Sequence, residues 1–172
     1  MNYASIKNCD VANGIGIRIS LFVSGCRHKC KNCFNQEAWD FTYGEEFTEE
    51  TLDKLRTLLA PSYIHGLSLL GGEPMEKENQ EGLLPVYRMV KNEFPEKTIW
   101  CYSGFTFEQL LAMCDILPHT REILSYIDVL VDGKFVEELK DISLRFRGSS
   151  NQRIIDVRKS LESNTVVEWK ED

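Results

Sequence analysis

The chain carries three cysteines, Cys26, Cys30 and Cys33, within a stretch of eight residues. This C-x3-C-x2-C spacing constrains the fold, because one short loop must turn all three thiolates toward the same point. Three thiolates on such a loop can hold an iron–sulfur cube and leave one iron without a protein ligand, whereas electron-carrying ferredoxin clusters usually have four cysteine ligands. The spacing therefore predicts a [4Fe-4S] cluster whose open iron binds a small molecule, and we expect this molecule to be S-adenosylmethionine.

A structural zinc site is the main alternative for these cysteines, with Cys9 or His28 as the fourth ligand. Zinc sites mostly combine two C-x2-C pairs, or one pair with two distant histidines, and neither pattern occurs here. A disulfide framework is disfavoured, because the opening residues MNYASIKN lack the charged start and apolar run of an export signal. We therefore expect a cytoplasmic protein in which Cys9, Cys101 and Cys114 are small buried apolar residues.

The length and charge of the chain limit its organisation and its partners. A chain of 172 residues is long enough for one well-packed domain, so we expect a single domain over residues 1–172. The net charge of −7 disfavours binding to a nucleic-acid backbone, which requires clustered Lys and Arg. No apolar run reaches the length of about 18 residues that a transmembrane helix needs. We therefore expect a soluble protein that binds neither nucleic acid nor membrane.

Segments with strand and helix periodicity alternate along the chain, which predicts an α/β fold with a mainly parallel sheet. The first predicted strand, 17–23, leads directly into the cysteine loop. Thr48 is followed by two acidic residues and spaced leucines, which predicts a helix with Thr48 as its N-cap. We expect strands over 17–23, 64–70, 98–102 and 127–131, less regular strands near Leu144 and over 154–157, and helices over 49–59, 78–94 and 106–113.

The motif Gly71-Gly72-Glu73-Pro74 follows the second predicted strand immediately. In α/β folds ligands bind outside the carboxyl ends of the strands, so this motif and the cysteine loop are predicted to face the same mouth. The glycines let a ligand approach the backbone closely, and Pro74 favours an extended conformation at Glu73. Backbone carbonyls and the Glu73 carboxylate can then accept hydrogen bonds from an ammonium group.

Several segments match a known family in register: 10–16 (DVANGIG), 21–26 (LFVSGC), 33–35 (CFN) with Trp39, 71–74 (GGEP), 130–135 (LVDGKF) and 147–152 (RGSSNQ). Through them the chain resembles the radical S-adenosylmethionine enzymes and, within these, the activating proteins of anaerobic ribonucleotide reductase. His28 and the pair Phe34-Asn35 distinguish this group from other radical enzymes with the same cysteine spacing. The resemblance implies a partial, open (βα) TIM-like barrel, shortened because a closed barrel takes about 250 residues.

The resemblance implies an enzyme that reductively cleaves S-adenosylmethionine at a [4Fe-4S] cluster held by Cys26, Cys30 and Cys33. The products would be methionine and a 5′-deoxyadenosyl radical. This radical would take a hydrogen atom from a glycine in the large subunit of anaerobic ribonucleotide reductase and leave a glycyl radical there. The implied partners are that subunit and reduced flavodoxin or a similar electron donor, and a homodimer is a plausible assembly.

The resemblance also implies cofactor-binding residues. Gly71, Gly72 and Glu73 would bind the amino group of the methionine moiety. Asn32 stands where many relatives carry an aromatic residue before the last cysteine, and its backbone would serve the adenine instead. Ser103, after the third predicted strand, is a candidate for a ribose hydroxyl. Asp132, after the fourth, is a candidate for the methionyl carboxylate, a cation or the partner's glycine loop.

Two other functions remain open. A different glycyl-radical activase, such as that of pyruvate formate-lyase, would share the cysteine loop and Gly-Gly-Glu, but those chains tend to be longer and to lack the segment 147–151. A zinc-binding interaction module is the other alternative. His28, His65 and His119 have no carboxylate partner visible in the sequence, and their side chains are expected to be solvated or packed. An open barrel favours a protein substrate, because a partner's loop must reach the reacting carbon closely.

Overall fold

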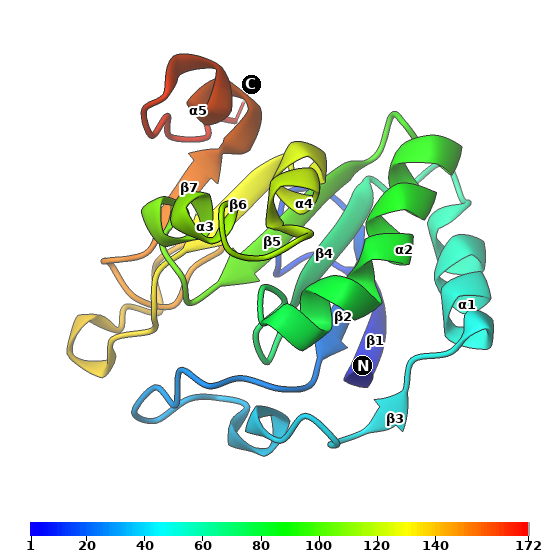
Figure 1. The fold of residues 1–172 in the computed structure, drawn as a ribbon, viewed down its shortest axis with the longest axis horizontal. Helices are drawn as coiled ribbons and strands as arrows, with labels where there is room; N and C mark the ends of the chain where they lie inside the picture. Colours follow the sequence, from blue (N-terminus) through cyan, green and yellow to red (C-terminus); the bar gives the residue numbers. More distant parts are fainter. Residues whose placement is uncertain (172) are drawn as a thin grey trace.

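The computed structural model describes residues 1–171 and has a mixed α/β fold built on one seven-stranded sheet. The strands are β1 (Asn2–Asp10), β2 (Arg18–Val23), β3 (Glu45–Glu46), β4 (Gly66–Gly71), β5 (Thr98–Ser103), β6 (Val129–Asp132) and β7 (Arg153–Asp156). They follow the order β3-β1-β2-β4-β5-β6-β7 (Figure 1). The pairings from β2 through β6 are parallel, whereas β1, β3 and β7 run antiparallel to their neighbours. The predicted parallel sheet is therefore confirmed for its centre only.

The helices are α1 (Glu49–Leu59), α2 (Lys77–Glu93), α3 (Phe107–Met113), α4 (Thr120–Tyr126) and α5 (Val157–Ser163), with short 3-10 turns η1 (Gln36–Trp39) and η2 (Glu137–Leu139). Of these five helices, α1 to α3 lie close to their predicted positions. Thr48 is the predicted N-cap of α1, where its N–H donates to the Thr51 hydroxyl at 3.1 Å. Helix α2 ends at Glu93, because Pro95 disfavours a helical conformation at the residue before it.

Three predictions about the fold were incomplete or wrong. The segment near Leu144 forms no strand; it belongs to a loop in which Lys140 and Ser149 form a single bridge. Strands β1 and β3 and helices α4 and α5 had not been predicted. Cys9 is exposed rather than buried, because it lies at the irregular end of β1 with a positive φ of 54°. Cys101 is fully buried, as expected, whereas Cys114 is only partly buried.

Helices α1 to α4 cover one face of the sheet, and the main hydrophobic core lies between them and the strands (Figure 1). Alternate strand residues such as Leu69 and Cys101 point into this core, since successive side chains face opposite sides of a sheet. The opposite face carries a smaller apolar cluster around Trp100 and Val131. The helices therefore leave this second face free for loops and for a cavity.

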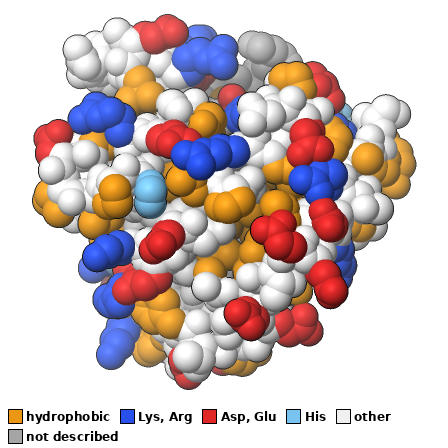
Figure 2. Space-filling view, turned by 45° about the vertical axis from the view of Figure 1, so that its right-hand side comes forward, with side chains coloured by type: hydrophobic (Ala, Val, Ile, Leu, Met, Phe, Trp, Pro, Cys, Tyr) orange, Lys and Arg blue, Asp and Glu red, His pale blue; other side chains and the backbone are white. Residues whose placement is uncertain are grey.

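The molecular surface shows charges of both signs. Figure 2 shows Lys and Arg interspersed with Asp and Glu over one face, with hydrophobic side chains between them. This face therefore presents no continuous basic surface of the kind that nucleic-acid binding requires. No helix within residues 1–171 is both long enough and apolar enough to cross a bilayer.

The turn from β1 to β2 is held by the buried carboxylate of Asp10. This carboxylate accepts the Ser20 hydroxyl at 2.6 Å, the Asn13 side-chain amide at 2.7 Å and the Ala12 N–H at 3.0 Å. A carboxylate with several donors stabilises a turn by replacing the hydrogen bonds that water would make. The turn is thereby fixed at the sheet, and Ala12 and Asn13 line the cavity described below.

Candidate functional site

A cavity of about 380 Å³ lies at the carboxyl ends of the parallel strands. The loops that leave β2, β4, β5 and β6 all contribute to its lining. Figure 1 shows the long loop after β2 and the loop before β7 projecting from this end of the sheet. The expectation that the cysteine loop and the Gly-Gly-Glu-Pro turn face one mouth is therefore confirmed.

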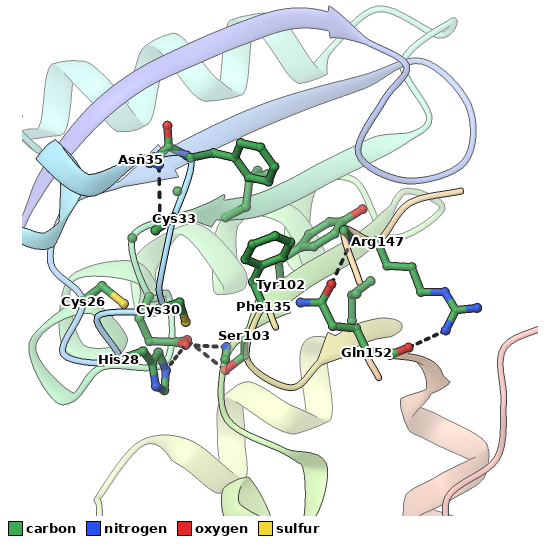
Figure 3. A pocket seen from close by; sticks show the side chains of 18 of the residues that line it. Cys26, His28, Cys30, Cys33, Asn35, Tyr102, Ser103, Phe135, Arg147 and Gln152 are labelled. Carbon is green, nitrogen blue, oxygen red and sulfur yellow. Dashed lines mark hydrogen bonds and ion pairs between the residues drawn. The ribbon is translucent and has the colours of Figure 1, made fainter. Parts of the chain in front are cut away.

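The three cysteines of the loop, Cys26, Cys30 and Cys33, all line this cavity as partly exposed, free thiols (Figure 3). Within residues 1–171, no three His, Cys, Asp or Glu side chains converge closely enough to hold one metal ion. A single zinc ion requires such convergence, because its sulfur ligands all lie about 2.3 Å from the metal. An iron–sulfur cube takes each thiolate at a separate corner, so a wider arrangement of thiols around a cavity fits a cluster.

The protein environment acts differently on each thiol. Burial raises the pKa of Cys26 to about 11, whereas the backbone N–H of His28 favours the thiolate and acts to lower this pKa. Burial also raises the pKa of Cys30, and the backbone N–H of Phe135 opposes this change. Cys33 accepts a hydrogen bond from the N–H of Asn35 at 3.5 Å. A backbone N–H thus donates to Cys33, and backbone groups favour the thiolates of Cys26 and Cys30, as they do where a protein tunes an iron–sulfur cluster.

The Gly-Gly-Glu-Pro turn packs directly on the cysteine loop. The Gly72 N–H donates to the Val23 carbonyl and the Glu73 N–H donates to the Gly25 carbonyl, each at 2.8 Å. A Cβ atom on Gly72 would lie 2.6 Å from the Gly25 oxygen. Gly71 has φ of 108°, which only glycine adopts without strain. The two glycines therefore allow the two backbones to pack closely against each other.

The carboxylate of Glu73 is almost completely buried and already has protein partners. His28 Nε2 lies 2.6 Å from one of its oxygens. His28 is therefore packed, one of its two expected states, and its partner was not visible in the sequence because 45 residues separate the pair. Ser103 lines the cavity as expected, yet its hydroxyl donates to Glu73 at 2.9 Å.

Two of the expected cofactor-binding residues lie outside the lining of the cavity. Asn32 is exposed in the cysteine loop, with a φ of 55°. Asp132 is buried, and its carboxylate accepts the Phe107 N–H at 2.8 Å and Arg153 Nε at 3.0 Å. These contacts stabilise the start of α3 and the pairing of β6 with β7. The carboxylate of Asp132 is therefore engaged in contacts within the fold, whereas the neighbouring residue Gly133 lines the cavity.

An apolar wall of the cavity had not been predicted. Tyr102, Phe135 and Phe146 line it together with residues of the loop before β7. That loop is held by Gln152, whose side chain accepts the Gly148 N–H and donates to the Gly133 carbonyl, both at 2.9 Å (Figure 3). The sequence positions of Tyr102 and Phe135 could have indicated this wall, because the two residues flank motifs that follow strands β5 and β6.

Two polar groups of the lining residues lack a partner within the described part of the chain. These are the indole N–H of Trp39 and the hydroxyl of Tyr102, both buried. Buried donors are nearly always hydrogen-bonded in folded proteins. The missing partners of these two groups are consistent with a site that a bound molecule completes.

Comparison with known proteins identifies the class. Residues 12–155 match the family model described as "4Fe-4S single cluster domain". The fold and the three free thiols at one cavity thus belong to an iron–sulfur protein with a single cluster.

Relatives of known name define the family more closely. The chain is 42% identical over its full length to the anaerobic ribonucleoside-triphosphate reductase-activating protein of Enterobacteria phage T4, and covers all of that protein. It is 44% identical to the protein of the same name from Vibrio cholerae, over 90% of this chain and 97% of the relative. The Escherichia coli K12 protein of that name is 39% identical over 92% of this chain and all of its own length. The chain belongs to the family of anaerobic ribonucleoside-triphosphate reductase-activating proteins.

Proposed function

We propose that this chain activates an anaerobic ribonucleotide reductase and that it does so as a radical S-adenosylmethionine enzyme. The product would be a glycyl radical, formed when a hydrogen atom is removed from a glycine of the reductase. The observation that carries the proposal is that the cysteine loop, the Gly-Gly-Glu-Pro turn and the Ser103-Gly104 turn line one cavity. The names of the relatives support the choice of the reductase as partner.

In this proposal Cys26, Cys30 and Cys33 hold the cluster, and no fourth protein ligand is needed. When reduced, a [4Fe-4S] cluster with an open iron supplies the electron that splits the S–C5′ bond of bound S-adenosylmethionine into methionine and a 5′-deoxyadenosyl radical. The protein would fix the positions of the three thiolates, and backbone N–H groups favour the thiolate form at Cys26 and Cys30 and donate to Cys33. These donors stabilise negative charge on sulfur and so tune the reduction potential.

The ammonium group of the methionine moiety is assigned to backbone carbonyls of the Gly-Gly-Glu-Pro turn. The Glu73 carbonyl already accepts the Asn79 side-chain amide at 2.9 Å and the Glu76 N–H at 3.2 Å. Gly71 and Gly72 have no side chains, so a ligand can approach their carbonyls closely. We therefore assign the ammonium group to these two glycines.

The apolar wall formed by Tyr102, Phe135 and Phe146 is suited to the adenosine part of the cofactor. Aromatic and aliphatic side chains with a few polar groups are the usual lining of small-molecule sites. Water is excluded from such a surface, which protects a reactive radical from side reactions. In this assignment Asn32 contributes at most its backbone, since its side chain lies outside the cavity lining.

The single sheet, with helices on one face and the cavity on the other, would be the shortened open barrel expected from the sequence, in one domain. Its open side would admit the glycine loop of the reductase. Lys29 and Lys31 are exposed on either side of Cys30. Two cations beside the cluster would favour approach of an acidic electron donor such as reduced flavodoxin. A homodimer remains compatible with this arrangement.

The test is low-temperature electron paramagnetic resonance on protein that is reconstituted with iron and sulfide without oxygen and reduced with dithionite. Addition of S-adenosylmethionine should change the spectrum of the reduced cluster. Addition of the reductase should then produce a glycyl-radical signal and free methionine. A protein that takes up zinc and no iron would refute the proposal. A glycyl radical on pyruvate formate-lyase, and none on the reductase, would identify the other activase.

A further inference from the structure

One buried carboxylate joins three segments of the cavity. Glu73 is 1% exposed. Its Oε1 accepts from His28 Nε2 at 2.6 Å and from the Gly104 N–H at 2.7 Å. Its Oε2 accepts from the Ser103 hydroxyl and from the Met75 N–H, both at 2.9 Å. The carboxylate thus connects the cysteine loop, its own turn and the turn after β5.

The His28 ring occupies a place shaped for it. The side chain of His28 is 7% exposed, and its ring meets the Phe105 ring edge-on at a centroid distance of 4.5 Å. A Cβ atom on Gly104 would lie 2.6 Å from His28 Cδ2, so only glycine leaves room for the ring. Because an ionised carboxylate only accepts hydrogen bonds, Nε2 is the protonated ring nitrogen in this contact.

These contacts change the role expected for Glu73. Each carboxylate oxygen already receives two donors, so an ammonium group would have to displace one of them. Breaking hydrogen bonds to a buried charged group is costly, because no water replaces the lost partner. The glycine carbonyls nearby carry no such cost.

We propose that His28 and Glu73 form a clasp that holds the cysteine loop at a fixed position relative to the Gly-Gly-Glu-Pro turn. In this proposal, which rests on the proposed function, both are positioning residues. His28 fixes where the cluster lies with respect to the carbonyls that bind S-adenosylmethionine, and the Glu73 side chain does not bind the cofactor itself. The cluster and the cofactor are thereby aligned before the cofactor enters.

The clasp predicts a specific pattern of binding. Residues that orient metal ligands through hydrogen bonds typically contribute about 10- to 100-fold to metal affinity or activity. We expect His28→Ala to weaken binding of S-adenosylmethionine by about the same factor while iron is still taken up. The Glu73→Gln change should have a similar effect, because a neutral amide satisfies fewer of the four donors. The double variant should be no worse than about the stronger single one, since both changes break the same contact.

The experiment measures the dissociation constant of S-adenosylmethionine from the change in the cluster spectrum of the reduced protein, together with iron content and melting temperature. The His28→Gln variant keeps a nitrogen donor and should recover most of the affinity. The His28→Phe variant keeps the ring packing and loses the donor, so it should behave like His28→Ala. His65→Ala is the matched control, because it removes one hydrogen bond, from the Ile17 N–H at 2.9 Å, on an exposed histidine outside the cavity lining.

The outcomes separate this proposal from the proposed function. If the wild-type spectrum does not respond to S-adenosylmethionine, the proposed function fails. If the wild type responds and His28→Phe binds equally well, the clasp is refuted. Additive effects of His28→Ala and Glu73→Gln would also refute it, because they would show that Glu73 contacts the cofactor independently. If His28→Ala does not take up iron, the comparison of His28→Gln with His28→Phe decides in its place.

Discussion

The contact between Gly72 and the cysteine loop makes a sharp prediction about the Gly72→Ala variant. The new Cβ would lie 2.6 Å from the Gly25 oxygen and 3.0 Å from the oxygen of Ala38. Both neighbours are backbone atoms, which cannot turn away as a side chain can. The two loops therefore have to separate, and the hydrogen bond from the Glu73 N–H to the Gly25 carbonyl is weakened or lost.

The magnitude follows from these contacts. Overpacking by one methyl group costs about 1–3 kcal/mol, and one lost hydrogen bond costs about 0.5–1.5 kcal/mol. Alanine also lowers the conformational entropy of the unfolded chain, which raises the free energy of unfolding by about 0.4–1 kcal/mol. The net loss of unfolding free energy is therefore about 2.5 kcal/mol. For a domain of this size, a loss of that magnitude lowers the melting temperature by about 5–10 °C.

The assay is thermal unfolding of the reduced, metal-free protein, followed by circular dichroism, with Gly148→Ala as the control. A Cβ atom on Gly148 would lie 3.2 Å from a ring carbon of Phe135, a side chain that can adjust. We expect the control to change stability by less than about 1 kcal/mol. The reasoning is wrong if Gly72→Ala melts within about 1 °C of the wild type, or if Gly148→Ala is the less stable of the two.

Three further predictions concern other parts of the molecule. Asp132→Asn should destabilise the protein by about 1.5–3 kcal/mol, because it removes a buried charged acceptor, and should leave S-adenosylmethionine affinity unchanged in spectroscopic titrations. The side chain of Ile142 is 93% exposed in the loop before β7. Ile142→Asp should lower the yield of glycyl radical without slowing the dithionite-driven cleavage of the cofactor. Ile116→Asp, at a side chain that is 77% exposed between α3 and α4, should change neither quantity. The pKa of Asp10 is below its ordinary value, because hydrogen bonds from Ser20 and two other donors outweigh the effect of burial. Its stabilising effect should therefore be complete above about pH 4 and disappear as the pH falls further, so acid titration should bring the unfolding free energies of Asp10→Asn and the wild type together.

The predictable part of the fold is the part that local sequence determines. The central strands and helices α1 and α2 have buried apolar residues at regular spacing, and Thr48 caps α1, so the sequence pattern identified them. Strand β1 escaped prediction because only Tyr3 and Asp10 of its nine residues are buried, which leaves no apolar alternation. Leu144 suggested a strand because it is apolar, but it lines the cavity and pairs with no strand.

The site was predictable where a motif alone defines it. The cysteine loop and the Gly-Gly-Glu-Pro turn could be placed together, because both follow parallel strands. The contact between His28 and Glu73 could not be foreseen, since it depends on how two loops pack across a turn. The contacts of Asp132 could not be foreseen for a related reason: a carboxylate after a strand can serve the helix and strand beside it as readily as a ligand.

The two outer strands of the sheet also bear on how this protein associates. Beyond β7, the C-terminal segment already pairs with that strand, through the Asp156 N–H to the Val167 carbonyl and the Trp169 N–H to the Ile154 carbonyl, both at 2.9 Å. On the other side, β1 has two register shifts, and β3 covers only its first residues. Irregular or covered outer strands resist the addition of a foreign strand, which is a common route to aggregation. The sheet is therefore protected from growing into a larger one, and side chains and loops form the surface that remains open to another protein.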